Sequence, residues 1–266
     1  MVRQVSSVTV TDRRAAPPTG GSVKLTAVSK VFGRGSSAVR ALDQVSLEVP
    51  PGEFTCLIGA SGCGKSTLLS LVAGLEQPTS GEVSAGGGRV AFMFQEPALF
   101  PWLTAAGNVE LALRARGLGK AERRQRTEEL LDMVHLTGFG GKRPHQLSGG
   151  MRQRVALARA LAQDADVLLM DEPFGALDAM TRDVLHDELD RICAGRALTV
   201  LFVTHNVREA VRLGDRVVVL SSRPGRVIAE FDVPIERPRR IDSAPVAELA
   251  AQVTDRLREE MSRDGR

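Results

Sequence analysis

The chain has 266 residues, a length that suits one large α/β domain or two small ones, and its 43% hydrophobic and 25% charged residues are ordinary for a soluble globular protein. The formal net charge of +3 is too small and too scattered to indicate nucleic acid as a partner. Three widely spaced cysteines exclude a disulfide framework, and no Cys/His cluster has zinc spacing.

The N-terminal segment is polar and basic, with prolines and glycines near its end. Because of this composition, we expect residues 1–21 to form a disordered tail. The segment has no apolar stretch of the kind found in signal peptides, so no signal peptide is expected. No run of about 18 apolar residues occurs in the sequence, so no segment is expected to span a bilayer.

Strand-like patterns follow the tail. Residues 24–28 and 45–49 are predicted strands, and Pro50-Pro51-Gly52 marks a turn. Residues 54–58 form a short apolar strand, and a helix is predicted over 66–73.

A glycine-rich loop joins that strand to that helix and matches G-x-x-x-x-G-K-[ST]. Its glycines let backbone N–H groups point at one phosphate, and the helix N-terminus adds its dipole. Lys65 would reach the β- and γ-phosphates, and the Ser66 hydroxyl would ligate Mg²⁺. The predicted ATP-binding residues of the loop are Gly59, Ala60, Ser61, Gly62, Cys63, Gly64, Lys65, Ser66 and Thr67.

A mostly helical stretch is predicted at about 97–162, and a second segment with candidate catalytic residues follows it. The apolar strand 166–170 ends in two carboxylates, Asp171 and Glu172. Asp171 would complete the Mg²⁺ shell, directly or through water, and Glu172 would orient or deprotonate the attacking water. A surface acidic pair that caps the next helix is the alternative, but the preceding phosphate loop favours hydrolysis.

Non-alternating strands at 166–170, 199–203 and 216–220 indicate a parallel sheet covered on both faces. The predicted fold class is therefore α/β: a P-loop NTPase with a largely parallel sheet core, an N-terminal antiparallel β portion and an inserted helical subdomain. The expected divisions are 1–21 for the tail, 22–240 for the ATPase domain and 241–266 for a C-terminal helical extension.

The segment LSGGMRQR at 147–154 resembles the signature of ABC-transporter ATPases. Its serine and glycines open an amphipathic helix whose N-terminus can bind a γ-phosphate, and an ordinary serine N-cap would use the same helix end. The resemblance implies that this phosphate belongs to ATP held by the other subunit of a homodimer. The signature residues are Leu147, Ser148, Gly149, Gly150 and Met151.

Further family motifs cover 23–220 in order. Phe32 resembles the aromatic residue that stacks on adenine, although the family more often has Tyr and an isolated Phe is more often core. Gln95 resembles the Q-loop glutamine that contacts Mg²⁺ or water, and Asp178 resembles the D-loop residue that meets the partner subunit. His205 resembles the switch histidine, which contacts the γ-phosphate and steadies the catalytic carboxylate.

The remaining histidines, His135, His145 and His186, are expected to be structural or solvated. The segment Leu99 to Leu103 contains the only tryptophan of the chain. By resemblance it belongs to the groove that receives a coupling helix of integral membrane permease subunits, and core packing of the helical subdomain is the alternative.

The strings FQEPALFPWLTAAGNV, DEPFGALDAMTRD and LSSRPGRV resemble the nitrate/sulfonate/taurine importer group, and the tail after Val233 is most like the aliphatic sulfonate branch. The resemblance implies an ATP-hydrolysing subunit that energises sulfonate import from the cytoplasmic face of the cell membrane, with a periplasmic or lipoprotein solute-binding protein as indirect partner. Taurine, nitrate, or a thiamine precursor or other small anion are alternative cargoes. An ABC ATPase acting on DNA or ribosomes is the alternative of another class, and its usual coiled-coil insertion or second ATPase domain is not visible.

Overall fold

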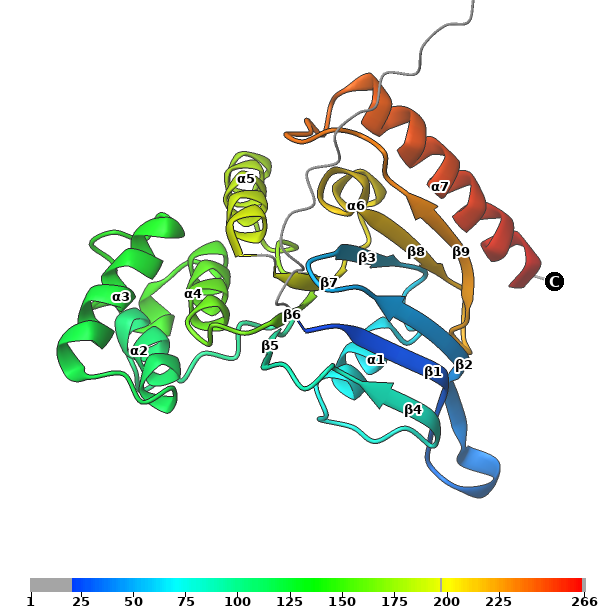
Figure 1. Ribbon diagram of the computed structural model, residues 1–266, viewed down its shortest axis with the longest axis horizontal. Coiled ribbons are helices and arrows are strands. Elements are labelled where there is room, and N and C mark those ends of the chain that lie inside the picture. Colours follow the sequence, from blue (N-terminus) through cyan, green and yellow to red (C-terminus); the bar gives the residue numbers. More distant parts are fainter. Residues whose placement is uncertain (1–20, 197, 265–266) are drawn as a thin grey trace, which may run out of the picture.

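The computed structural model describes residues 21–196 and 198–264 (Figure 1). The predicted tail therefore lies, apart from Gly21, outside the described residues. The strands are β1 (Val23–Phe32), β2 (Val39–Val49), β3 (Phe54–Ile58), β4 (Ser80–Ser84), β5 (Val90–Met93), β6 (Val167–Asp171), β7 (Thr199–Val203), β8 (Arg216–Leu220) and β9 (Val227–Asp232). The α-helices are α1 (Lys65–Val72), α2 (Ala105–Ala115), α3 (Lys120–Met133), α4 (Gly149–Leu161), α5 (Ala179–Arg196), α6 (Val207–Leu213) and α7 (Ala244–Asp264).

The main sheet has the strand order β5-β6-β7-β3-β8-β9, in which the first five strands are parallel and β9 is antiparallel to β8. Both of its faces are buried, which explains the continuous apolar runs in its central strands. In β3, for example, Phe54, Cys56 and Ile58 pack into one hydrophobic core while Leu57 packs into the other. The predicted α/β fold with a largely parallel sheet is confirmed.

A second, antiparallel sheet of order β2-β1-β4 covers one face of the main sheet, with α1 between the two (Figure 1). This helix contacts strands of both sheets. The opposite face is covered by α5, α6 and α7, which share the larger hydrophobic core. The phosphate loop, which leads into α1, is thereby held between two sheets.

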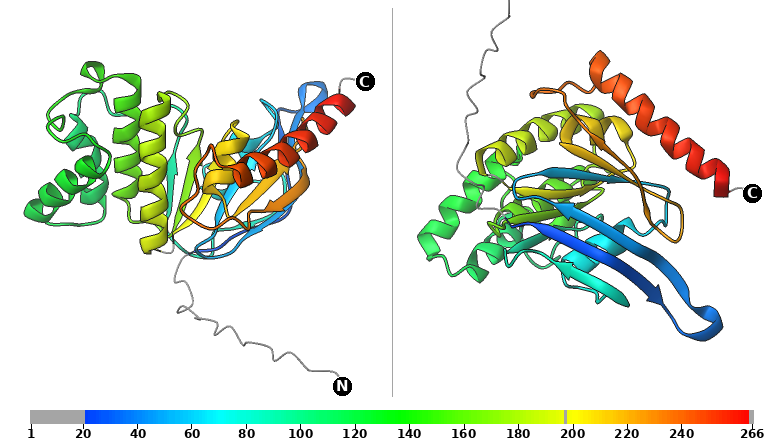
Figure 2. Two further views of the ribbon diagram at one scale, coloured as in Figure 1. Left: turned by 90° about the horizontal axis from the view of Figure 1, so that it is seen from above. Right: turned by 45° about the vertical axis from the view of Figure 1, so that its right-hand side comes forward.

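Helices α2, α3 and α4 pack against one another beside β5, on the side of the molecule away from α7 (Figures 1 and 2). They occupy the stretch for which the sequence predicts helices. Asn108 is fully buried at the start of this group. Its side chain accepts a hydrogen bond from the backbone N–H of Phe100 at 2.8 Å and donates to the carbonyl of Thr104 at 2.9 Å, which fixes the turn that leads into α2.

Three strands were not predicted. Strands β4 and β5 flank the glycines at 86–88, which have a turn-like composition. Strand β4 is mostly polar and exposed and β5 is only four residues long, so neither has a clear strand pattern. Strand β9 is a short edge strand between prolines, and only its antiparallel pairing with β8 makes it part of the sheet. Strands β1 and β2 are also longer than predicted. Among the described residues, no helix combines the length and the apolar character that crossing a membrane requires.

Candidate active site

Loops that follow parallel strands converge on one cavity of about 320 Å³, because the carboxyl ends of parallel strands lie at the same edge of a sheet. The phosphate loop follows β3, Gln95 follows β5, and Glu172 follows β6. The antiparallel sheet contributes the outer wall. The cavity is lined by Phe32, Val39, Ala41, Ser61, Gly62, Gly64, Lys65, Ser66, Thr67, Gln95, Glu172 and Arg223.

The phosphate loop has the conformation that its glycines predict. Gly64, the residue before α1, has a φ of 103°, and a Cβ there would lie 2.7 Å from Leu42 Cδ2. Only glycine suits both the left-handed backbone and this close approach. The buried Lys65 ammonium donates to the carbonyl oxygens of Gly59 and Ala60, each at 2.9 Å, which holds its charge against the loop that the phosphates would occupy.

Asp171 lies buried at the end of β6, close to the Ser66 hydroxyl at the start of α1. Burial raises the pKa of the Asp171 carboxyl, and the Ser66 hydrogen bond and the Lys65 charge act in the opposite direction. A carboxylate paired with a hydroxyl presents the hard oxygen donors that Mg²⁺ prefers. These residues therefore fit a Mg²⁺ ion bound beside the phosphates.

Glu172 lies at the centre of a second polar group. Its Oε2 is 3.2 Å from Nδ1 of His205 and 3.4 Å from Nε2 of Gln95, so the structure brings together the three predicted catalytic residues. Glu172 has a φ of 45°, an uncommon conformation for a residue with a side chain. Its backbone N–H donates to Val203 at 2.9 Å, which ties this turn to the strand that precedes His205.

Phe32 stands at the mouth of the cavity with 40% of its surface exposed. The ammonium of Lys30 lies 4.9 Å from the centre of its ring. An exposed aromatic ring beside a nucleotide-sized cavity offers a flat surface for a planar base. The alternative expectation, that this phenylalanine belongs to the core, is wrong.

The signature segment caps α4. The Ser148 hydroxyl accepts a hydrogen bond from the backbone N–H of Met151 at 3.2 Å, as an N-cap does. None of the residues 147–151 lines the cavity. Asp178, the predicted D-loop residue, accepts hydrogen bonds from the backbone and hydroxyl of Thr181, and these hold the pKa of its carboxyl below the usual value.

The segment 99–103 divides between core and surface. Leu99 packs against the large hydrophobic core, while Trp102 is 67% exposed, with its ring centre 5.4 Å from that of Phe100. Core packing therefore applies to Leu99, while Trp102 leaves an aromatic side chain accessible at the surface.

The three other histidines lie apart from the cavity. His135 and His145 are exposed near the helical group, whereas His186 is fully buried on α5 and hydrogen-bonded to Glu209. His135 and His145 are thus solvated, His186 is buried in the structure, and none of the three lines this cavity.

Two residues near the site were not singled out by sequence reasoning. Gln153, buried in α4, donates to the carbonyl of Gln95 at 3.2 Å and so joins the signature helix to the Q-loop. Arg223 lines the cavity, and its Nε donates to the Gly62 carbonyl at 3.2 Å. Arg223 lies in LSSRPGRV, a string that pointed to an importer group but carried no residue role.

Comparisons with known proteins agree with this geometry. The family described as ABC transporter matches residues 42–175. An aliphatic sulfonates import ATP-binding protein from Mesorhizobium japonicum is 48% identical, over 81% of this chain and 82% of the relative. A taurine import ATP-binding protein from Burkholderia pseudomallei is 46% identical, over 79% and 84%, and a nitrate import ATP-binding protein from Synechocystis is 45% identical, over 79% and 82%.

A solved structure is also similar. The dimeric, post-hydrolysis structure of the ATP-binding cassette MJ0796 with ADP and Pi superimposes with a TM-score of 0.74 at 36% identity, over 80% of this chain and all of that one. The chain thus shares its fold with a protein that was captured with the products of ATP hydrolysis.

Proposed function

This chain belongs to the ABC transporter family and is an ATPase, and from that premise we propose that it energises the import of an aliphatic sulfonate through a membrane permease. The observation that carries the ATPase part is that Lys65 and Glu172 line one nucleotide-sized cavity, with Asp171 close to Lys65 and Ser66 and with His205 hydrogen-bonded to Glu172. The reaction is ATP + H₂O to ADP + phosphate.

The proposed mechanism assigns one task to each group. Lys65 and the loop N–H groups bind the β- and γ-phosphates, while Phe32 stacks on the adenine. Ser66, Asp171 and Gln95 would hold Mg²⁺, which supplies charge neutralisation on the transferred phosphoryl group. Glu172 orients the attacking water and takes its proton, and His205 holds Glu172 in place while its other ring nitrogen faces the γ-phosphate.

The position of the signature segment supports the proposed homodimer. Since residues 147–151 lie outside the cavity of their own chain, their helix N-terminus is free to meet a γ-phosphate held by a second copy. We propose a closed two-fold arrangement with two shared ATP sites, in which Asp178 meets the partner subunit. The dimeric state of the similar cassette supports this proposal.

The proposed permease contact is the surface at 99–103, centred on Trp102. An exposed tryptophan beside an apolar neighbour is the kind of side chain that anchors protein interfaces. This surface follows Gln95 closely in the chain, so a movement of the permease would reach the catalytic carboxylate by a short path. The division into an ATPase domain at 22–240, a helical subdomain at about 97–162 and a C-terminal extension at 241–266 belongs to this proposal, as does a location on the cytoplasmic face of the membrane.

The cargo is proposed from the relatives and from the C-terminal tail. The relatives named for sulfonate, taurine and nitrate import are almost equally identical to this chain. Sequence identity alone therefore does not indicate which of these cargoes the chain serves. The tail after Val233 favours the sulfonate branch. A solute-binding protein is the proposed indirect partner, and the relatives lend no support to an ATPase acting on DNA or ribosomes.

The test is growth of the host lacking this gene on an alkanesulfonate or taurine as sole sulfur source, and on nitrate as sole nitrogen source. We expect a growth defect confined to unsubstituted alkanesulfonates. The wild-type gene should restore growth, and the Glu172→Gln gene should not. A defect on taurine or nitrate alone would reassign the cargo. A permease, a binding protein and a flavin-dependent sulfonate monooxygenase encoded beside the gene would agree with the sulfonate proposal.

A further inference from the structure

A cluster of buried polar side chains lies behind the loop that carries His205. Glu209 and Arg212 of α6, His186 of α5 and Thr204 at the end of β7 are each at most 5% exposed. None of them lines the nucleotide cavity. The site described above uses none of these four groups.

Hydrogen bonds join the cluster into one unit. The Thr204 hydroxyl donates to Oε2 of Glu209, and Nε2 of His186 lies 2.7 Å from Oε1 of the same carboxylate. Arg212 donates to Nδ1 of His186 at 2.9 Å. Because a guanidinium cannot accept a hydrogen bond, Nδ1 must be the acceptor, and the ring proton must therefore reside on Nε2 and be donated to Glu209.

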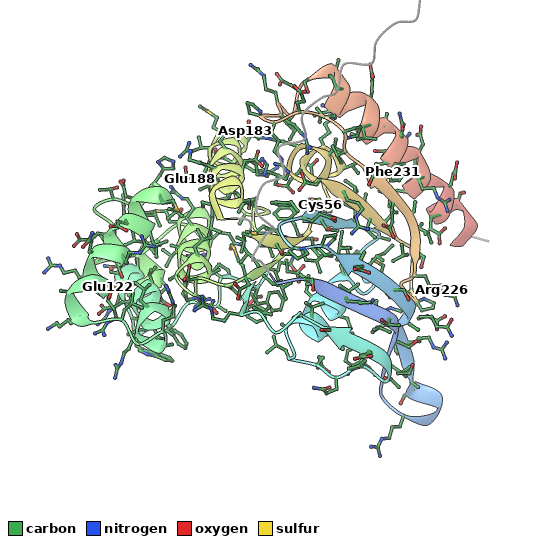
Figure 3. All side chains as sticks on the ribbon, viewed as in Figure 1. Cys56, Glu122, Asp183, Glu188, Arg226 and Phe231 are labelled. Carbon is green, nitrogen blue, oxygen red and sulfur yellow. The ribbon has the colours of Figure 1, made fainter. Side chains whose placement is uncertain are left out.

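The positive charge of Arg212 is paired with two carboxylates, although its Nε has no hydrogen-bond partner among the described residues. Arg212 forms ion pairs with Asp183 at 2.9 Å and Asp187 at 2.6 Å, two carboxylates on the outer face of α5 (Asp183 is labelled in Figure 3). A buried charged network of this kind adds little stability compared with apolar packing, although breaking one of its bonds is costly. Its contribution to a particular geometry is therefore a better reason for its presence.

That geometry is the position of His205. Thr204 Oγ also accepts a hydrogen bond from the backbone N–H of Asn206 at 3.0 Å, so the residues on both sides of His205 are tied to Glu209. The Asn206 side chain in turn accepts from the backbone N–H of Glu209 at 3.2 Å. The imidazole of His205 is largely exposed, and its hydrogen-bond partner within the described structure is Glu172.

Two further contacts connect the cluster with Glu172. A cavity of about 20 Å³ is lined by both Glu209 and Glu172, together with Thr204 and His205. The ring of His186 lies 5.1 Å from that of Phe174, which follows Glu172 by two residues. The cluster thus supports the loops that carry both catalytic side chains.

We propose that His186, Glu209 and Arg212 act as positioning residues, which hold Thr204 and thereby set the imidazole of His205 against Glu172. This inference rests on the proposed role of His205 in hydrolysis. Because the cluster is rigid and buried, it sets this geometry before nucleotide binds, and its loss affects the chemical step more than the binding of ATP.

The test compares His186→Gln with His186→Leu in the full chain. Glutamine keeps an N–H donor for Glu209 and an acceptor for Arg212, whereas leucine keeps only the bulk. We expect His186→Leu to lower kcat by about tenfold, the scale of a small misplacement of a catalytic group, with KM for ATP within about twofold. His186→Gln should retain at least about half of the wild-type kcat.

A purely structural role predicts a different pattern. Both variants would then lower Tm, but kcat per folded molecule would equal that of the wild type, and this result would overturn the proposal. If His186→Leu does not fold, Thr204→Val compared with Thr204→Ser asks the same question of the hydroxyl, and equal kcat values for that pair would overturn it as well. Full activity in His205→Ala would instead refute the proposed role of the switch histidine itself.

Discussion

Nδ1 of His205 lies 3.2 Å from Oε2 of Glu172, although the two residues follow different strands and come together only because those strands are neighbours in the sheet. The same carboxylate oxygen faces the amide of Gln95. A carboxylate with two polar neighbours and an open side towards the nucleotide cavity is suited to bind and deprotonate a water molecule.

Glu172→Gln should therefore lower ATP turnover by roughly 10²–10⁴-fold, the usual weight of a general base. ATP binding should be retained, because Lys65 and the phosphate loop are unaltered. The rate of phosphate release measures turnover, and the Kd of a fluorescent ATP analogue measures binding. Glu230→Gln, a change on the edge strand β9, serves as the control, and an active Glu172→Gln enzyme would refute the assigned role.

Asp171→Asn should weaken the dependence on Mg²⁺. Removal of a carboxylate that holds the ion directly or through water costs about 10–100-fold in metal affinity. Burial raises the pKa of Asp171, so its carboxylate becomes protonated at a higher pH than an exposed carboxylate does. As the pH falls, the wild-type protein should therefore need more Mg²⁺, because a protonated carboxyl binds the ion less well. Titration of Mg²⁺ at fixed ATP measures both effects. Asp166→Asn is the matched control, since an asparagine oxygen still accepts the hydrogen bond from Arg89, and an unchanged half-saturation in Asp171→Asn would contradict the assignment.

Phe32→Ala should raise the Kd for ATP by about tenfold, because a stacked aromatic pair contributes about 0.5–1.5 kcal/mol beyond its buried area. Phe32→Tyr should bind as the wild type does. Phe139, which is similarly exposed but lies in the helical group, provides the matched alanine control. Equal affinities for all of these variants would remove Phe32 from the adenine site.

The Glu172→Gln variant should be a dimer in saturating MgATP and revert to monomer when ATP is removed, as measured by light scattering after gel filtration. Adding Ser148→Arg should prevent dimerisation, because a long side chain would obstruct the helix N-terminus that meets the partner's phosphate. Ser84→Arg on strand β4 is the control. A variant that stays monomeric with ATP and with the permease would contradict the shared-site model.

Trp102→Glu should abolish co-purification with the permease while leaving the Tm of the isolated chain within a few degrees of the wild type, because surface substitutions usually change stability little. Leu75→Glu is the control: this leucine is also exposed but lies after α1, far from α2 in the chain. Undiminished co-purification of Trp102→Glu would move the permease contact elsewhere.

Local patterns were sufficient wherever the chemistry is contiguous in the chain. The phosphate loop could be recognised from its glycines, Lys65 and Ser66, because consecutive backbone N–H groups and one helix N-terminus form the whole feature. The same holds for the N-cap at Ser148 and for the fold class, since apolar strands between helices imply a buried parallel sheet. Strand β9 was not predicted, because its antiparallel pairing with β8, rather than its composition, makes it a strand.

The sequence by itself determined that the chain binds and hydrolyses ATP, because those motifs carry their geometry locally. Only the tertiary structure decided which side chains meet across the sheet. Asp171 lies close to Ser66, Arg223 contacts the phosphate loop, and His186 is hydrogen-bonded to Glu209. The physical reason is that strand order sets which loops are neighbours, and strand order follows from packing over the whole chain, which no short segment encodes.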